Sequence, residues 1–238
     1  MIKLFLTSSL GTNMKVNEER IPCIMDNSNN MIERLKSSLT NQNKLVIISS
    51  DPENVLLNDL YHHINTESFL LSGFSFNEII TIDKRNEKQA ENMIKDADLI
   101  ILSGGHVPTQ NKWFKKINLK NILQKYNGVI LGISAGSMNC ADIVYSCPEH
   151  EGEAIDNHYE RFISGLSLTD INILPHFDEL KEEVLDGINV FQDIVLPDSN
   201  KRAFYTLNDG SFIEVSDEDV LFHGDCFKIE NGQMKKMT

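Results

Sequence analysis

Residues 128–139 read Gly-Val-Ile-Leu-Gly-Ile-Ser-Ala-Gly-Ser-Met-Asn. An apolar, β-branched run passes into small residues, which predicts a buried strand turning sharply into a helix. The segment Gly132–Gly136 matches the pattern G-x-S-x-G around Ser134. In such a turn the serine has a strained backbone, and side chains at the glycine positions would clash with the neighbouring strand and helix. The stretch therefore predicts an α/β fold that presents the Ser134 hydroxyl above a sheet.

Comparable apolar runs recur along the chain, with helical patterns between them. Many of the runs are apolar on consecutive residues, which is typical of strands buried on both faces of a parallel sheet. The predicted strands are Ile2–Leu6, Leu45–Ile48, Glu78–Ile82, Leu99–Leu102, Val129–Ile133 and Ile171–Leu174. The predicted helices are Met25–Leu39, Pro52–Leu71, Glu87–Lys95 and Trp113–Tyr126. We expect a mostly parallel central sheet with helices on both faces.

The pattern of apolar runs changes in the last third of the sequence. Short apolar runs at Phe204–Thr206, Ser211–Val215 and Val220–His223 are separated by the polar turns 208–210 and 217–219. This spacing predicts antiparallel hairpins at the margin of the sheet. Because no linker-like stretch interrupts the pattern, we expect one domain over residues 1–238.

Composition and charge narrow the choice of partners. The chain has 238 residues and a net charge of −13, so nucleic acids and anionic membranes would be repelled. We therefore expect neither as a partner, and no apolar run approaches the length of a membrane span. The four cysteines lack the C-x-x-C spacing of metal sites. Four cysteines in 238 residues do not make a disulfide scaffold, which favours a reduced, cytoplasmic protein. His150-Glu151 lacks the H-E-x-x-H spacing, and we expect no metal or cofactor.

A serine nucleophile needs oxyanion donors and a base. Ser103-Gly104-Gly105-His106 follows a buried strand, so this Gly-Gly turn could present a bare backbone amide as one donor, with the Ala135 amide as the other. Among seven histidines, His176 directly follows the predicted strand Ile171–Leu174. Because the carboxyl ends of parallel strands share one rim, His176 is the predicted base for Ser134.

The acid that would orient His176 is not fixed by spacing. The candidates between Ser134 and His176 are Asp142, Glu149, Glu151, Glu153 and Asp156. All but Asp142 lie in one irregular stretch, so the residue pattern leaves the choice open.

Four segments together resemble the peptidase E family, whose members are serine peptidases on the class I glutamine amidotransferase-like fold. They are GISAGS around Ser134, SGGH ending at His106, LPHF around His176 and the late DGSFIEV, and the resemblance extends from about Ile2 to Gly224. It implies Ser134 as nucleophile, His176 as base, and the Gly105 and Ala135 amides as oxyanion donors. The family's acid position falls on Glu149, giving a Ser-His-Glu triad, with Glu151 as the second choice.

The same resemblance implies a dipeptidase-like or exopeptidase-like serine peptidase that hydrolyses short peptides through an acyl-enzyme, without a cofactor. One family feature is missing. Members that cleave after N-terminal aspartate carry G-H-x-G-E-T-R after the histidine, whereas residues 177–189 here contain five acids and no arginine. We therefore expect Asp-X dipeptides to be poor substrates and neutral or basic side chains to be preferred, unless Arg161 or Arg202 pairs with the substrate aspartate.

Two other functions fit the same residues. A cyanophycinase-like hydrolase would cut a β-linked Asp-Arg polymer, with Glu182 and Glu183 receiving arginine side chains. A non-catalytic binding protein would keep the turn at Ser134 for folding alone, and a fluorophosphonate probe at Ser134 would distinguish it from both enzymes. The oligomeric state stays open, with a homodimer among the options.

Overall fold

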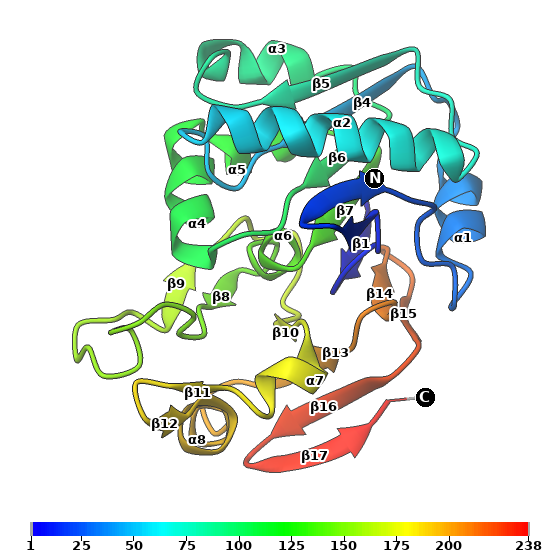
Figure 1. Cartoon of the computed structure of the whole chain (residues 1–238). Helices are drawn as coiled ribbons and strands as arrows, with labels where there is room; N and C mark the ends of the chain where they lie inside the picture. Colours follow the sequence, from blue (N-terminus) through cyan, green and yellow to red (C-terminus); the bar gives the residue numbers. More distant parts are fainter. Residues whose placement is uncertain (1, 238) are drawn as a thin grey trace.

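The computed structural model describes residues 2–237 and contains a seven-stranded central sheet in the order β15-β14-β1-β7-β6-β4-β5 (Figure 1). Five strands run parallel to one another: β1 (Lys3–Thr7), β4 (Lys44–Ile48), β5 (Glu78–Ile82), β6 (Leu99–Leu102) and β7 (Val129–Ile133). At one margin, β14 (Phe212–Val215) and β15 (Val220–His223) are antiparallel. The predicted parallel sheet is confirmed, as are these two marginal strands.

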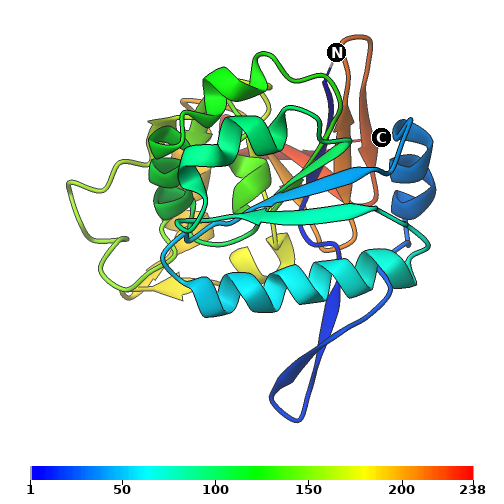
Figure 2. The ribbon, with the colours of Figure 1, turned by 90° about the horizontal axis from the view of Figure 1, so that it is seen from above.

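Helices cover both faces of this sheet (Figure 2). One face packs on α1 (Met31–Ser38) and α2 (Val55–Leu71), through residues such as Leu45 and Ile47. The other packs on α3 (Ala90–Ile94), α4 (Val107–Lys116), α5 (Leu119–Leu123) and α6 (Ala135–Met138), through Val46 and Ile48. Alternate residues of one strand thus enter opposite cores, which explains why these strands are apolar throughout.

The helix boundaries differ from the predicted ones in ways that local chemistry explains. The α2 helix begins after Asn54, whose side chain accepts a hydrogen bond from the Leu57 amide, and not at the predicted Pro52. The predicted helix Trp113–Tyr126 is broken, because Asn118 adopts a left-handed φ of 57° between α4 and α5. A short 3₁₀ turn, η1 (Glu87–Gln89), precedes α3.

A second, four-stranded sheet lies beside the central one, in the order β10-β13-β16-β17 (Figure 1). Its strands are β10 (Ile173–Leu174), β13 (Phe204–Leu207), β16 (Cys226–Glu230) and β17 (Gln233–Lys236). Two predictions fail here: β10 is not a strand of the central sheet, and β13 is not a marginal hairpin strand but pairs in parallel with β10. A separate apolar cluster that includes Leu174 and Phe204 packs between this sheet and its helices.

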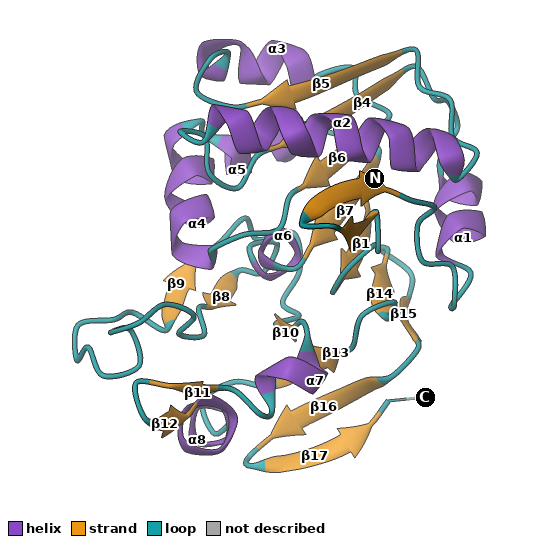
Figure 3. Cartoon of the chain, viewed as in Figure 1, coloured by secondary structure: helices purple, strands orange, loops and turns teal. Residues whose placement is uncertain are grey.

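Shorter elements complete the chain, and Figure 3 shows the long loop that joins β8 to β9. They are β8 (Ile143–Tyr145), β9 (Phe162–Ser164), α7 (Phe177–Leu180), β11 (Val184–Leu185), β12 (Ile188–Asn189), the π-helical η2 (Val190–Val195) and α8 (Leu196–Asp198). Within residues 2–237, no helix is both long and apolar enough to cross a membrane.

A β-hairpin that the sequence did not predict projects from the body of the molecule (Figure 2). It consists of β2 (Asn13–Val16) and β3 (Glu19–Pro22). Its two turn residues, Asn17 and Glu18, have φ values of 49° and 70°. A hairpin turn with positive φ values usually contains glycine, but neither of these two turn residues is a glycine.

Candidate active site

Ser134 occupies the sharp turn between β7 and α6. Its φ of 48° and ψ of −114° lie outside the regions that serine normally adopts. The strain is held by backbone hydrogen bonds on both sides, from the Ser134 amide to the Thr7 carbonyl (2.9 Å) and from the Met138 amide to the Ser134 carbonyl (3.0 Å). The strained turn predicted from the sequence is confirmed.

Close packing explains both flanking glycines. A Cβ at Gly136 would lie 2.1 Å from the Leu102 carbonyl oxygen on β6, and one at Gly132 would lie 2.6 Å from the Ser137 Cα. These distances are too short for any side chain. The two glycines let α6 approach the sheet closely, as the sequence predicted.

A buried polar pair ties the turn to β1. The Ser137 hydroxyl donates to the Thr7 carbonyl (2.9 Å) and accepts from the Thr7 amide (2.8 Å). The Thr7 hydroxyl donates to the Gly132 carbonyl (2.7 Å). Since Thr7 and Ser137 are at most 1% exposed, these bonds are not exposed to competition from water. They fix the backbone from which Ser134 projects.

His176 faces Ser134 from the second sheet. It follows β10 and Pro175 with a left-handed φ of 51°, and its amide donates to the Ser8 hydroxyl (2.8 Å). Its Nε2 atom lies 3.1 Å from the Ser134 hydroxyl oxygen, within hydrogen-bond distance. The structure therefore brings together the predicted nucleophile and the predicted base.

Asp209 holds the other ring nitrogen of His176. The Nδ1 atom lies 2.8 Å from Asp209 Oδ1, and the Ser8 hydroxyl donates to the same oxygen (2.7 Å). A continuous series of hydrogen-bond contacts thus runs from Ser134 through His176 to Asp209. In the tautomer that this geometry favours, Nδ1 carries the proton and Nε2 can accept one from serine.

The parallel pairing of β10 with β13 explains why His176 and Asp209 meet. Leu174 lies opposite Thr206, so the residues just beyond each strand emerge at the same edge. The acid predicted from the sequence was sought only between Ser134 and His176. The turn Asn208-Asp209-Gly210, which follows its strand much as His176 follows β10, was the signal that could have identified Asp209.

Glu149 does not make the contact that the sequence predicted for it. It lies in the loop between β8 and β9, where its amide donates to Glu153 Oε2 (2.9 Å). Within residues 2–237, neither Glu149 nor Glu151 forms a hydrogen bond with His176, because Asp209 already occupies Nδ1. Glu149 is still near enough to interact electrostatically with His176.

Protein atoms surround the Glu149 carboxyl even though solvent reaches its side chain. Partial loss of hydration, together with the charge of Glu153, raises the pKa of Glu149 to about 7. The hydrogen bond to Asp209 raises the pKa of His176 above its ordinary value, against the opposing effect of burial. The same bond lowers the pKa of Asp209. Asp209 is therefore the carboxylate whose position and lowered pKa allow it to stabilise a protonated His176.

The predicted oxyanion turn lies beside Ser134. A Cβ at Gly104 would be 3.4 Å from the Ser134 Cβ, and one at Gly105 would be 2.5 Å from the Ser50 hydroxyl oxygen. Within the described part of the chain, neither the Gly105 nor the Ala135 amide donates a hydrogen bond to another protein group. An oxyanion donor must have such an uncommitted N–H group, and of these two residues Gly105 lines the cavity in front of Ser134.

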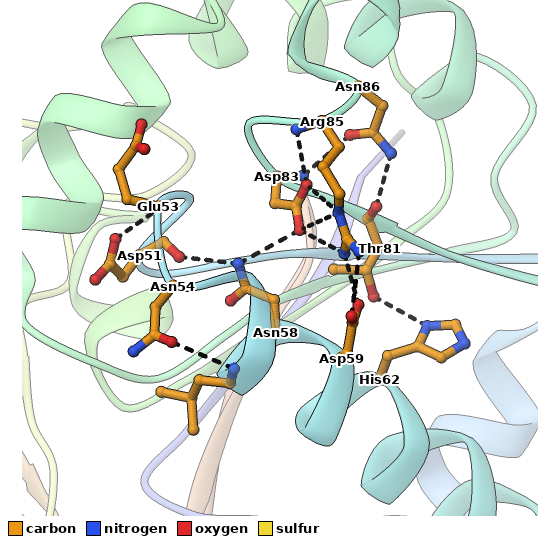
Figure 4. A network of polar contacts seen from close by, with 11 residues as sticks. Asp51, Glu53, Asn54, Asn58, Asp59, His62, Thr81, Asp83, Arg85 and Asn86 are labelled. Atoms are coloured by element: carbon orange, nitrogen blue, oxygen red, sulfur yellow. Dashed lines mark hydrogen bonds and ion pairs between the residues drawn. The ribbon is translucent and has the colours of Figure 1, made fainter.

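A cavity of about 520 Å³ opens in front of Ser134 and His176, a size typical of small-molecule sites. It runs along the carboxyl ends of β1, β7, β6 and β4, under α2. A polar network supports its far wall (Figure 4). There the buried Asp83 binds the Arg85 guanidinium (2.7 Å), and Asn58, which lines the cavity, donates to the Asp51 carbonyl (3.0 Å).

The remaining residues singled out from the sequence lie outside this cavity. Arg161 pairs with Asp198 (2.5 Å), and Arg202 pairs with Asp142. Glu182 lines a different cavity of about 470 Å³, beside Phe177 and Phe191. None of the three lines the cavity in front of Ser134.

Comparison with known proteins places the chain among peptidases. The family model described as peptidase family S51 matches residues 24–222. A solved peptidase from an acI-B1 actinobacterium is 13% identical, with a TM-score of 0.69, covering 99% of this chain and 93% of that one. A putative peptidase E protein from Listeria monocytogenes EGD-e is 14% identical, with a TM-score of 0.62 and complete coverage of both chains. No curated protein matches.

Proposed function

The chain belongs to peptidase family S51 and is a peptidase, and we propose that it hydrolyses short peptides with Ser134 as its nucleophile. The observation that supports this most strongly is the series of contacts from Ser134 Oγ to His176 Nε2 and from His176 Nδ1 to Asp209. A strained serine, a base and an orienting carboxylate are the parts that serine acyl transfer requires. The acid is Asp209 in this proposal, and not Glu149.

In the first half of the reaction, His176 Nε2 takes the proton of Ser134 as the oxygen attacks the peptide carbonyl carbon. The carbonyl oxygen becomes an oxyanion, which the Gly105 and Ala135 amides stabilise. His176 then gives the proton to the departing amine, the C–N bond breaks, and Ser134 carries the acyl group.

In the second half, water replaces the amine. His176 takes a proton from the water as it attacks the acyl carbon, and the ester bond to Ser134 breaks when the proton returns to the serine oxygen. Asp209 keeps the proton on Nδ1 and stabilises the imidazolium that forms in each half. Because its charge is close to His176, removing it costs rate without removing the nucleophile.

A screen of the purified protein against a library of short peptides tests the proposal. We expect hydrolysis by the wild-type chain and loss of several orders of magnitude in rate for Ser134→Ala, because the variant has no nucleophile. Circular dichroism and thermal unfolding check that the variant is folded. Equal hydrolysis by wild type and Ser134→Ala would contradict the proposal, and the absence of hydrolysis by either would favour a non-catalytic protein.

A further inference from the structure

The cavity in front of Ser134 contains one arginine and no acidic residue among its lining residues. The arginine is Arg20, which reaches the cavity from the β2–β3 hairpin. Because the whole chain has a net charge of −13, a cavity lining without a carboxylate is unexpected. An anionic group that enters there meets a cation and no direct like charge.

The Arg20 side chain is exposed and makes two contacts with neutral groups. Its Nη1 atom donates to Asn13 Oδ1 (3.0 Å), and its guanidinium lies 5.9 Å from the centre of the Tyr61 ring on α2. Both partners also line the cavity. Since one N–H group is used by Asn13, several donors of the guanidinium remain for a ligand.

Among the described residues 2–237, Arg20 differs from the other four arginines in that it has no acidic partner. Arg34 pairs with Glu214, Arg85 with Asp83, Arg161 with Asp198 and Arg202 with Asp142. Across residues 2–237, no carboxylate forms an ion pair with Arg20. A planar guanidinium that is positioned but unpaired, in a cavity, suits a carboxylate that binds through two oxygens.

We propose that Arg20 binds a carboxylate of the peptide substrate, which rests on the proposed function of the cavity at Ser134. The same cavity reaches both groups, so one short peptide can place its scissile carbonyl at Ser134 and a carboxylate at Arg20. The carboxylate comes from the peptide's C-terminus or from an acidic side chain. The proposal revises the expectation that acidic substrates are rejected, because the cation comes from an unpredicted hairpin.

Calorimetric binding to the full-length Ser134→Ala variant tests the proposal without turnover. The probes are trialanine, trialanine amide, and trialanine amide with aspartate at position one, two or three. We expect at least one carboxylate-bearing peptide to bind about tenfold more tightly than trialanine amide. A gain for trialanine identifies the C-terminal carboxylate, and a gain for an aspartyl amide identifies the side chain.

Adding Arg20→Gln to that variant should abolish the gain, and Arg20→Lys should keep part of it. Lys15→Gln is the matched control, because Lys15 lies opposite Arg20 on the hairpin but pairs with Glu18 and does not line the cavity. It should leave the gain unchanged. Unchanged selectivity in Arg20→Gln, or no binding of any probe, would overturn the proposal.

Failure of the proposed function would look different. Fluorophosphonate labelling of the wild-type protein measures the reactivity of Ser134 and does not test the carboxylate site. If Ser134 stays unlabelled while Arg20→Gln still removes carboxylate selectivity, the nucleophile assignment is wrong and the carboxylate site stands. If Ser134 is labelled and Arg20→Gln has no effect, the nucleophile assignment stands and the carboxylate site is wrong.

Discussion

At the scale of single residues, His176 connects the two parts of the molecule that form the site. Its ring joins Ser134 of the central sheet to Asp209, which follows a strand of the second sheet. The Ser8 hydroxyl contacts both His176 and Asp209, so it fixes their relative position. The relative position of His176 and Asp209 therefore depends on the uncharged hydroxyl of Ser8.

Asp209→Asn tests the acid of the proposed triad. An amide at this position can hold the wrong histidine tautomer and cannot stabilise an imidazolium, so kcat/KM should fall by about 10²–10⁴. Glu149→Gln is the control, and it should reduce kcat/KM much less, because Glu149 acts on His176 only at a distance. The test is to measure kcat/KM of both variants on one peptide. A larger loss in Glu149→Gln than in Asp209→Asn would make Glu149 the acid of the triad.

The raised pKa of His176 predicts the pH dependence. The reaction needs neutral His176, and its hydrogen bond with Asp209 favours the protonated form. Activity should therefore be low in acid and rise with pH, with the midpoint of kcat/KM above the ordinary histidine value of about 6.5. Asp209→Asn should move the residual midpoint downward. A wild-type midpoint below 6.5 would contradict this explanation.

The sequence predicted that Ser134 and His176 lie together because local signals mark both positions. Glycines surround the first, and a strand immediately precedes the second. Asp209 was missed because its role depends on the pairing of β10 with β13, which brings together residues more than thirty positions apart. Arg20 was missed because the hairpin turn at Asn17 and Glu18 contains no glycine.

At the scale of elements, the geometry of the site depends on how closely α6 approaches the sheet. Gly136 faces the backbone of β6, and Gly132 faces the backbone of α6 itself. A side chain at either position would push the helix away from the strand. Ser134 would then lose its hydrogen bond to the Thr7 carbonyl and move relative to His176.

Gly136→Ala measures this constraint. Its Cβ would lie 2.1 Å from the Leu102 carbonyl oxygen, and we expect a loss of about 3 kcal/mol or more in the free energy of unfolding. Gly152→Ala is the matched control: Gly152 has a φ of 91° but no atom within 4 Å of the added Cβ, so the cost should be about 1–2 kcal/mol. Denaturant unfolding of both variants checks the order, and equal losses would contradict it.

Predictions at this scale succeeded where a strand is buried on both faces. The bounds of β6 and β7 agree with the sequence pattern, because their consecutive apolar residues pack alternately into the two cores. The pattern could not assign β10 and β13 to a second sheet. Short apolar runs carry no information about which strand they pair with.

At the scale of the whole molecule, a buried acid connects two strands of the central sheet to a helix that packs on the sheet. Glu214 on β14 pairs with Lys3 on β1 (2.5 Å) and Arg34 on α1 (3.1 Å), and it is 7% exposed. Burial would raise the pKa of Glu214, but hydrogen bonds and charges from Lys3 and Arg34 outweigh burial and lower it. The pair of cations thus stabilises the folded state whenever Glu214 is ionised.

This arrangement predicts a loss of stability in acid. Because the folded pKa lies below the unfolded value of about 4.3, the contribution of Glu214 is present above that pH and is lost as pH falls through the folded pKa. Glu214→Gln should be less stable at pH 7 and should lose less stability between pH 5 and pH 3. Denaturant unfolding across this range checks the slope, and parallel curves for the two proteins would contradict it.

The chemistry proposed for Ser134, His176 and Asp209 depends on an activated serine oxygen. Its most direct test is the rate of labelling by a fluorophosphonate, with the modified residue identified by mass spectrometry. We predict a single adduct on Ser134 in the wild-type protein, strongly slowed labelling in Asp209→Asn, and essentially none in His176→Ala. No adduct on Ser134 in folded wild-type protein, or equal labelling rates in all three proteins, would contradict the proposed triad.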